Sequence, residues 1–159
     1  MKTLLIGIGN PGRQDDGLGP ALVEQLAESR PPERSVVQIA GGTADAFWAY
    51  QLNIEDAHIL RDYEVVVFAD ACVEGDDPAA LGPIEPAAAI AFTTHEMSPA
   101  SVLALGEELY GNAPRAFLLA IRGYAWEMEE GLTAEAAQNL DLAESLLVEF
   151  FQNRGTPVE

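Results

Sequence analysis

Two adjacent carboxylates, Asp15 and Asp16, follow a glycine-rich turn near the start of the chain. The turn, residues 7–12, comes directly after an apolar run, as the loop after a buried strand would. A loop that binds a dinucleotide or a phosphate is usually positive and rich in backbone N–H donors. Carboxylates repel phosphate and attract metal ions, so this loop indicates a metal site rather than a nucleotide site.

Two other potential metal ligands also follow expected strands. Asp70 ends the apolar run 64–70, and His95 lies in a loop after a weaker apolar stretch. With Asp16 they supply two carboxylates and an imidazole, a donor set suited to zinc or nickel. One carboxylate of the Asp15–Asp16 pair could instead cap the first helix, Asp70 could cap a turn, and the histidine could be solvated. Three such residues at three strand ends make a metal site harder to dismiss, although the spacing alone leaves these alternatives open.

The other histidine and the cysteine have simpler interpretations. His58 lies among charged residues, which indicates a surface position. Cys72 follows Asp70 by two residues and is expected to be a small buried hydrophobic residue. Nearby carboxylates would raise the pKa of its thiol, which argues against a cysteine nucleophile. Six larger side chains are expected in the core or at the rim of the site: Phe47, Trp48, Tyr50, Tyr124, Trp126 and Met128.

Composition narrows the class of protein. The 159 residues include 26 acidic and eight basic ones, for a formal charge of −18. This charge opposes binding to nucleic acid or anionic membranes and suits a basic protein partner or a cation, although it also suits a merely soluble surface. One cysteine permits no intrachain disulfide. Without a signal peptide or an apolar run of about 20 residues, a cytoplasmic protein is expected, by default a monomer.

The elements that must position these residues alternate between strands and helices. Strands are expected at 3–9, 35–40, 64–70, 84–92 and 116–121, and helices at 17–29, 44–51, 98–110 and 133–151, with a turn or short helix at 54–60 and a loop at 75–82. The pattern predicts one α/β domain over residues 1–152, a three-layer α/β/α sandwich with a mostly parallel sheet of about five strands. Residues 153–159 are expected to form a flexible tail.

Several segments also match a known family in order and spacing over about residues 1–150. They are Gly7-Ile8-Gly9-Asn10, Asp15-Asp16-Gly17-Leu18-Gly19, Gly41-Gly42-Thr43, Ala69-Asp70-Ala71, His95 before a helix, and Gly131-Leu132-Thr133. With these segments the chain resembles the hydrogenase maturation endopeptidases. Those enzymes cleave the C-terminal extension from the large subunit of nickel–iron hydrogenases.

The resemblance implies that Asp16, Asp70 and His95 are both the nickel-contacting and the catalytic residues. The nickel would be that of the substrate, the precursor large subunit, and zinc or cadmium could take its place. That ion could activate water or polarise the scissile carbonyl, or a carboxylate could act as the base. One departure is Ala40, since the family often has an aspartate there. Glu55 could substitute for that carboxylate, or lie on a solvated helix face.

Three other functions are compatible with parts of the sequence. A non-catalytic nickel-binding chaperone or docking module for the large subunit would carry the same residues, and only a cleavage assay separates it from a protease. Gly7 to Gly12 also resembles the opening of peptidyl-tRNA hydrolases, but the charge of −18 opposes tRNA binding. A dehydrogenase of the Rossmann type would need an acidic residue near Ala40, and none is present there.

Overall fold

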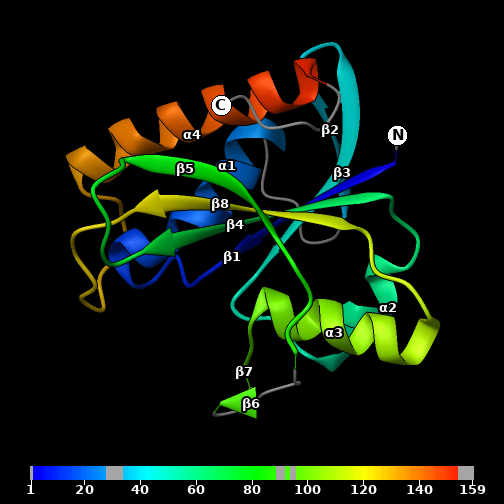
Figure 1. The fold of residues 1–159 in the computed structure, drawn as a ribbon. Helices are drawn as coiled ribbons and strands as arrows, with labels where there is room; N and C mark the ends of the chain where they lie inside the picture. The colour runs from blue at the N-terminus through cyan, green and yellow to red at the C-terminus, as the bar shows by residue number, and fades with distance from the viewer. Residues whose placement is uncertain (1, 28–33, 89–91, 94–95, 154–159) are drawn as a thin grey trace.

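The computed structural model describes residues 2–27, 34–88, 92–93 and 96–153 (Figure 1). In chain order the elements are β1 (Thr3–Ile8), the 3₁₀ helix η1 (Gln14–Gly17), α1 (Leu18–Ala27), β2 (Ser35–Ile39), β3 (Gly42–Ala49), α2 (Ile54–Leu60), β4 (Val65–Cys72), β5 (Ala79–Ile84), β6 (Phe92–Thr93), β7 (Glu96–Met97), α3 (Pro99–Tyr110), β8 (Arg115–Arg122) and α4 (Ala134–Gln152). None of the helices in the described ranges is long and apolar enough to cross a membrane.

The main sheet has six strands in the order β2-β3-β1-β4-β8-β5. The four central strands run parallel to one another, while the edge strands β2 and β5 are antiparallel to their neighbours. This arrangement confirms the expected mostly parallel α/β sheet and adds one strand to it. Strands β6 and β7 form a separate small hairpin.

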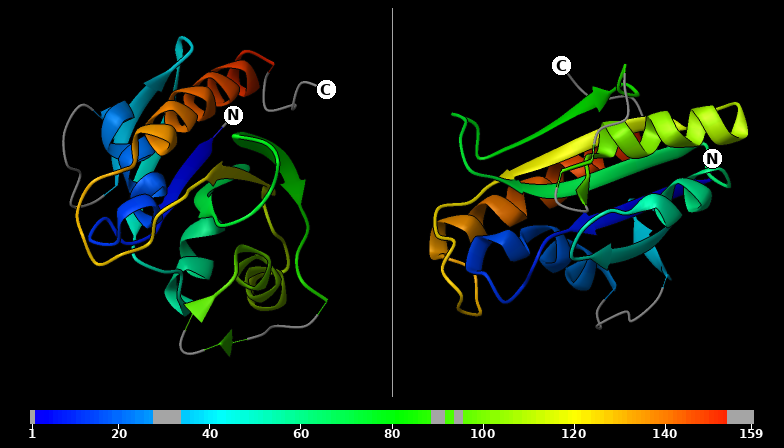
Figure 2. Two further views of the ribbon diagram at one scale, coloured as in Figure 1. Left: turned by 90° about the vertical axis from the view of Figure 1, so that its left-hand side faces the viewer. Right: turned by 90° about the horizontal axis from the view of Figure 1, so that it is seen from below.

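Helices cover both faces of the sheet, which confirms the three layers (Figures 1 and 2). Side chains alternate along each central strand: Leu5, Val67 and Leu119 pack with α1 and α4. Leu4, Phe68 and their even-numbered neighbours pack with α2 and α3 on the other face. The continuous apolar runs in the sequence therefore reflect strands that are buried on both sides, as parallel strands usually are.

The helix expected at 44–51 is wrong, because residues 44–49 belong to strand β3. Its apolar residues are spaced as in a helix, but Ala44 and Ala46 are buried in alternation and the strand is paired on both edges. Strands β2 and β3 form a hairpin whose two connecting residues, Ala40 and Gly41, have φ of 50° and 79°. Two positive φ angles are typical of the tight type I′ turn.

The strand expected at 84–92 is also misplaced. The edge strand is β5, Ala79–Ile84, in the segment expected to be a loop; residues 85–88 are not in a strand, and 89–91 lie outside the described residues. Pairing with β8 overrides the weak strand tendency of its glycine and proline, which an edge position tolerates. The end of the helix expected at 17–29 and most of the expected tail, residues 154–159, also lie outside the described residues.

The remaining expectations hold closely. The helices expected at 98–110 and 133–151 are α3 and α4, and Ser98 and Thr133 cap them by accepting hydrogen bonds from the backbone N–H of Ser101 and Ala136. The turn or short helix expected at 54–60 is α2.

Candidate active site

The candidate site lies where two neighbouring parallel strands, β1 and β4, send their chains to opposite faces of the sheet. The chain leaves β1 through α1 on one face, whereas β4 connects to β8 through β5 and through α3 on the other face. Such a switch point leaves a crevice at the carboxyl ends of the strands, where α/β proteins bind ligands. Asp16 follows β1, and Asp70 lies in β4 beside Ile8 of β1.

The first loop is shaped by close backbone contacts that exclude larger residues. Gly9 has a φ of 142°, and a Cβ atom there would lie 1.8 Å from the carbonyl oxygen of Asp16. The backbone N–H of Asn10 donates to Asp16 Oδ2 at 2.9 Å, and the Asn10 side chain accepts from the N–H of Gly12 at 2.9 Å. These bonds hold the Asp16 carboxylate beside the end of β1.

Helix α1 packs directly on the strand ends. A Cβ atom at Gly19 would lie 2.4 Å from the carbonyl oxygen of Ala69 and 2.5 Å from that of Ile8. No side chain can be accommodated there, so the helix can approach β1 and β4 this closely only with glycine. Since Asp16 lies just before this helix, the contact also sets the position of its carboxylate relative to β4.

Asp15 has a structural role that differs from that of its neighbour. It is fully buried, and its carboxylate accepts hydrogen bonds from the backbone N–H groups of Tyr124 and Ala125 and from both the N–H and the hydroxyl of Thr133, at 2.8–3.1 Å. Burial alone raises the pKa of this carboxyl, but these bonds outweigh it and hold the pKa below its ordinary value. Asp15 therefore ties the first loop to the start of α4.

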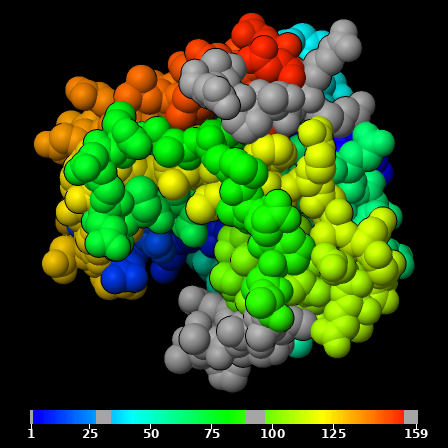
Figure 3. Space-filling view, viewed as in Figure 1, coloured from blue at the N-terminus to red at the C-terminus, as the bar shows by residue number. Residues whose placement is uncertain are grey.

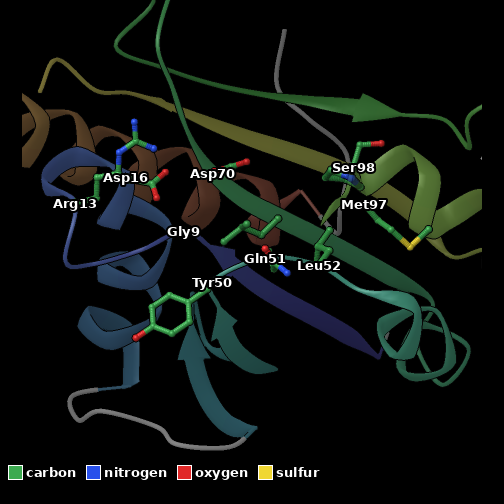
Figure 4. A pocket seen from close by; sticks show the side chains of 11 residues that line it. Gly9, Arg13, Asp16, Tyr50, Gln51, Leu52, Asp70, Met97 and Ser98 are labelled. Carbon is green, nitrogen blue, oxygen red and sulfur yellow. The ribbon is translucent and has the colours of Figure 1, made fainter. Parts of the chain in front are cut away.

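Asp16 and Asp70 line one cleft of about 410 Å³ (Figure 4). Because side chains alternate along a strand, Asp70 projects toward the face of Phe68, where α3 begins. The rest of the lining comes from the end of β1, from Arg13, and from residues 50–52 and 97–99. Figure 4 shows Asp16 and Arg13 toward one end of the cleft, Met97 and Ser98 toward the other, and Asp70 between them.

His95 lies outside the described residues, so the structure does not place it. The cleft lining includes Met97 and Ser98, which follow it by two and three residues. Met97 is held there because its N–H donates to the carbonyl of Leu52 at 3.3 Å, in a bridge between the segment after β3 and the start of α3. Among the described residues, no group of three potential metal ligands gathers in one place.

Sequence reasoning missed Arg13, Gln51 and Leu52 as cleft lining, and it placed Tyr50 only in the core or at the rim. The Arg13 Nε donates to the carbonyl oxygen of Trp126 at 3.0 Å, which holds an exposed cation at the Asp16 end of the cleft. Its place next to the Asp15–Asp16 pair was the available signal. Residues 50–52 reach the cleft only because β3 is a strand that runs parallel to β1.

Three further titratable residues, His58, Glu55 and Cys72, do not line the cleft. His58 is exposed, and its ring contacts Tyr110 and Arg61. Glu55 is exposed in the first turn of α2 and is not part of the cleft. Cys72 is half-buried, and burial is the main cause that raises the pKa of its thiol; Arg122 lowers it and Asp70 raises it.

Comparison with known proteins rests on structure alone, since no protein-family model and no curated protein matches the chain. The fold is similar to that of the hydrogenase maturating endopeptidase HybD from E. coli, with a TM-score of 0.73, 20% identity and coverage of 98% of this chain and 94% of that one. For the [NiFe] hydrogenase maturation protease HycI from Thermococcus kodakarensis these values are 0.64, 19%, 96% and 93%. For the hydrogenase 2 maturation peptidase from a Thaumarchaeota archaeon they are 0.64, 21%, 95% and 98%. This chain has the fold of the hydrogenase maturation endopeptidases.

Proposed function

We propose that this protein is an endopeptidase that removes the C-terminal extension of a nickel–iron hydrogenase large-subunit precursor after nickel has been inserted. The observation that carries the proposal is the meeting of Asp16 and Asp70 in one cleft at the β1–β4 switch point. The shared fold supports the proposal. The similar structures are named as hydrogenase maturation proteases, and this chain matches them over nearly their full length.

In this proposal the nickel ion belongs to the substrate. The precursor presents its metal and the adjoining tail to the cleft, where Asp16, Asp70 and His95 coordinate the ion. Carboxylate oxygens and imidazole nitrogen are ligands that nickel accepts. Cleavage then depends on metal insertion. The two carboxylates of the cleft attract the nickel ion of the precursor, and a precursor without nickel lacks this attraction.

Hydrolysis needs a water molecule that loses a proton as it attacks the scissile carbonyl carbon, after which the C–N bond breaks and the leaving amine nitrogen takes up a proton. Asp16 uses Oδ2 to accept the hydrogen bond from Asn10, and no hydrogen bond from the described residues reaches Oδ1. That oxygen is therefore the one that can contact the ion or take the proton from water. Arg13 is fixed at the same end of the cleft and supplies a positive charge near the oxygen that becomes negative as the carbonyl is attacked.

The test is to incubate the purified protein with nickel-loaded and nickel-free precursor and to read the loss of a C-terminal peptide by mass spectrometry. Cleavage of the loaded form alone is expected. Binding of the loaded precursor without cleavage would contradict the proposal and favour a nickel-binding chaperone or docking module instead.

Substitutions then assign the roles. We expect Asp16→Asn and Asp70→Asn each to lower the cleavage rate by at least about 100-fold, the loss typical of a catalytic acid or base. Glu55→Gln is the matched control, because this carboxylate is exposed and lies outside the cleft. Equal rates for the Asp70→Asn and Glu55→Gln variants would remove Asp70 from the site.

A further inference from the structure

Met128 is a large apolar side chain held in solvent by an ordered turn. It is 79% exposed, the highest value among the exposed large hydrophobic residues of the described chain. The turn is fixed on both sides of it: the Glu127 N–H donates to the side-chain oxygen of Gln14 at 3.0 Å, and the Gln14 N–H donates to the carbonyl of Glu129 at 2.8 Å. Its exposure therefore does not result from a loose loop.

The same turn forms part of the wall beside the candidate active site. The carbonyl of Trp126 accepts from Arg13, which lines the cleft, and the carbonyl of Ala125 accepts from the N–H of Asp15 at 3.1 Å. A partner that held Met128 would thus be aligned with the cleft at no cost in ordering the turn. Such preorganisation is what makes an exposed apolar side chain an effective interface anchor.

Two further exposed apolar side chains lie on the neighbouring loops. Tyr124 is 47% exposed, with its hydroxyl accepting from Asn139 at 2.9 Å and its ring covered by the Arg122 guanidinium 4.9 Å from the centroid. Arg122 also donates to the carbonyl of Val73, whose side chain is 64% exposed. The left view of Figure 2 shows the loop after β8 beside the first loop, and Figures 2 and 3 show the loop after β4 at the same end of the sheet.

The charges around these side chains indicate the chemistry of the partner. Six exposed carboxylates lie on the two loops: Glu74, Asp76, Asp77, Glu127, Glu129 and Glu130. The two nearby cations, Arg13 and Arg122, each donate to backbone carbonyls of the protein itself. The two loops therefore offer three exposed apolar side chains among six exposed carboxylates, and charge complementarity requires a basic partner.

We propose that residues 73–77 and 124–130 form a docking surface for a basic, partly apolar surface of the precursor protein, with Met128 as its anchor. This inference rests on the proposed function, because it names how that substrate is held while its tail enters the cleft. The carboxylates of the two loops speed encounter, and the apolar side chains keep the complex together.

The test measures docking and cleavage separately. Affinity is measured by titration with nickel-free precursor, which is expected to stay uncut, and KM and kcat are measured with the nickel-loaded form. Met128→Ala is expected to raise both Kd and KM about tenfold with kcat within about twofold, as for loss of one interface anchor. The control Leu142→Ala removes an exposed leucine of α4 and is expected to change neither.

A second variant tests the charges without altering the shape of the turn. Glu127→Gln, Glu129→Gln and Glu130→Gln together are expected to raise Kd about fivefold at low salt and to weaken its dependence on salt. The control carries three equivalent changes at exposed carboxylates of α3 and α4: Glu108→Gln, Asp141→Asn and Glu149→Gln.

Each outcome separates the two proposals. Normal cleavage with unchanged KM and Kd in the Met128 and triple variants, or changes no larger than in the controls, would overturn the docking surface and leave the protease. Binding that depends on Met128 with no cleavage by the unmodified protein would support the surface and overturn the protease. Absence of both binding and cleavage would overturn both.

Discussion

Asp15 and Asp16 are adjacent and chemically identical, yet they serve opposite purposes. Asp15 is buried and accepts four hydrogen bonds, so both of its oxygens are committed to the fold. Asp16 accepts one bond from the backbone of Asn10 and lines the cleft. At the scale of single residues, the pair therefore combines a structural carboxylate with one that is available to a ligand.

This division predicts different costs for the same substitution. Asp15→Asn is expected to lower the free energy of unfolding by about 3 kcal/mol, because an amide nitrogen would face a buried N–H donor where a charged acceptor now lies. Asp16→Asn is expected to cost less than about 1 kcal/mol, since one backbone bond is at stake. Urea unfolding of both variants measures the difference, and equal costs would contradict it.

The pH dependence of stability follows from the same carboxylate. The folded protein holds the pKa of Asp15 below its unfolded value, so its contribution to stability is present above the unfolded pKa and is lost as the pH falls through the folded pKa. Unfolding free energies measured from neutral to acidic pH should fall less steeply for the Asp15→Asn variant than for the unmodified protein. An equal slope would show that Asp15 does not contribute.

His95 is the residue of the proposed trio that the structure leaves unplaced. His95→Ala is expected to abolish processing of the nickel-loaded precursor without changing the melting temperature by more than about 2 °C, because a ligand to the substrate's ion is not part of the apolar core. Retained processing would remove it from the site, and loss of folding would give it a structural role instead.

Among the elements, the β2–β3 hairpin contains one residue, Ala40, whose backbone conformation is unfavourable for its residue type. Ala40 has a φ of 50°, a region that is unfavourable for residues with a Cβ atom other than asparagine or aspartate. The aspartate that the family resemblance expects at this position would suit that conformation, so the turn gives the position a conformational role independent of catalysis.

Ala40→Asn is therefore expected to stabilise the fold by about 0.5–1 kcal/mol, because Asn-Gly is the preferred pair for a type I′ turn. Thermal unfolding should show a rise in Tm of about 1–4 °C for a chain of this size. Ala40→Val serves as the control and is expected to lower Tm, since β-branched residues disfavour positive φ most strongly. Similar shifts in both variants would contradict this account of the turn.

The same hairpin shows why some elements could be predicted and others could not. The strand at 64–70 is a β-branched run buried on both faces, and the caps at Ser98 and Thr133 act through residues three positions away, so local sequence contains their causes. Strand β3 is fixed instead by its pairing with β2 and with β1, which lies far away in the sequence. Its apolar spacing suits a helix equally well.

Some residues of the candidate site could likewise be predicted from the sequence, and others could not. Asp16 and Asp70 could be predicted to share a cleft because one follows β1, the other lies near the end of β4, and parallel strands end at a common edge. Arg13 and residues 50–52 could not, because their positions depend on hydrogen bonds and pairings that only the folded chain forms. The burial of Asp15 likewise depends on Thr133, which lies 118 positions away.

At the scale of the whole molecule, a charge of −18 means that the compact state repels itself. Raising the ionic strength from 0.01 to 0.15 M shortens the screening length from about 30 to about 8 Å, so Tm in sodium chloride at neutral pH is expected to rise by several degrees. Near the isoelectric pH the same salt change should have little effect. A Tm that falls with salt at neutral pH would show that attractive ion pairs outweigh the repulsion.

The strand order also determines when the chain can fold. β1 is an inner strand of the sheet, and both of its partners come much later: Leu4 pairs with Asp45, and Thr3 with Val65. During synthesis β1 therefore emerges with two unpaired edges, and β4 gains its second partner only when β8 is complete. Because these distant pairings must form before the central strands are buried, folding is expected to be slow, and a chain interrupted before β8 would leave an unpaired edge on β4 that favours aggregation.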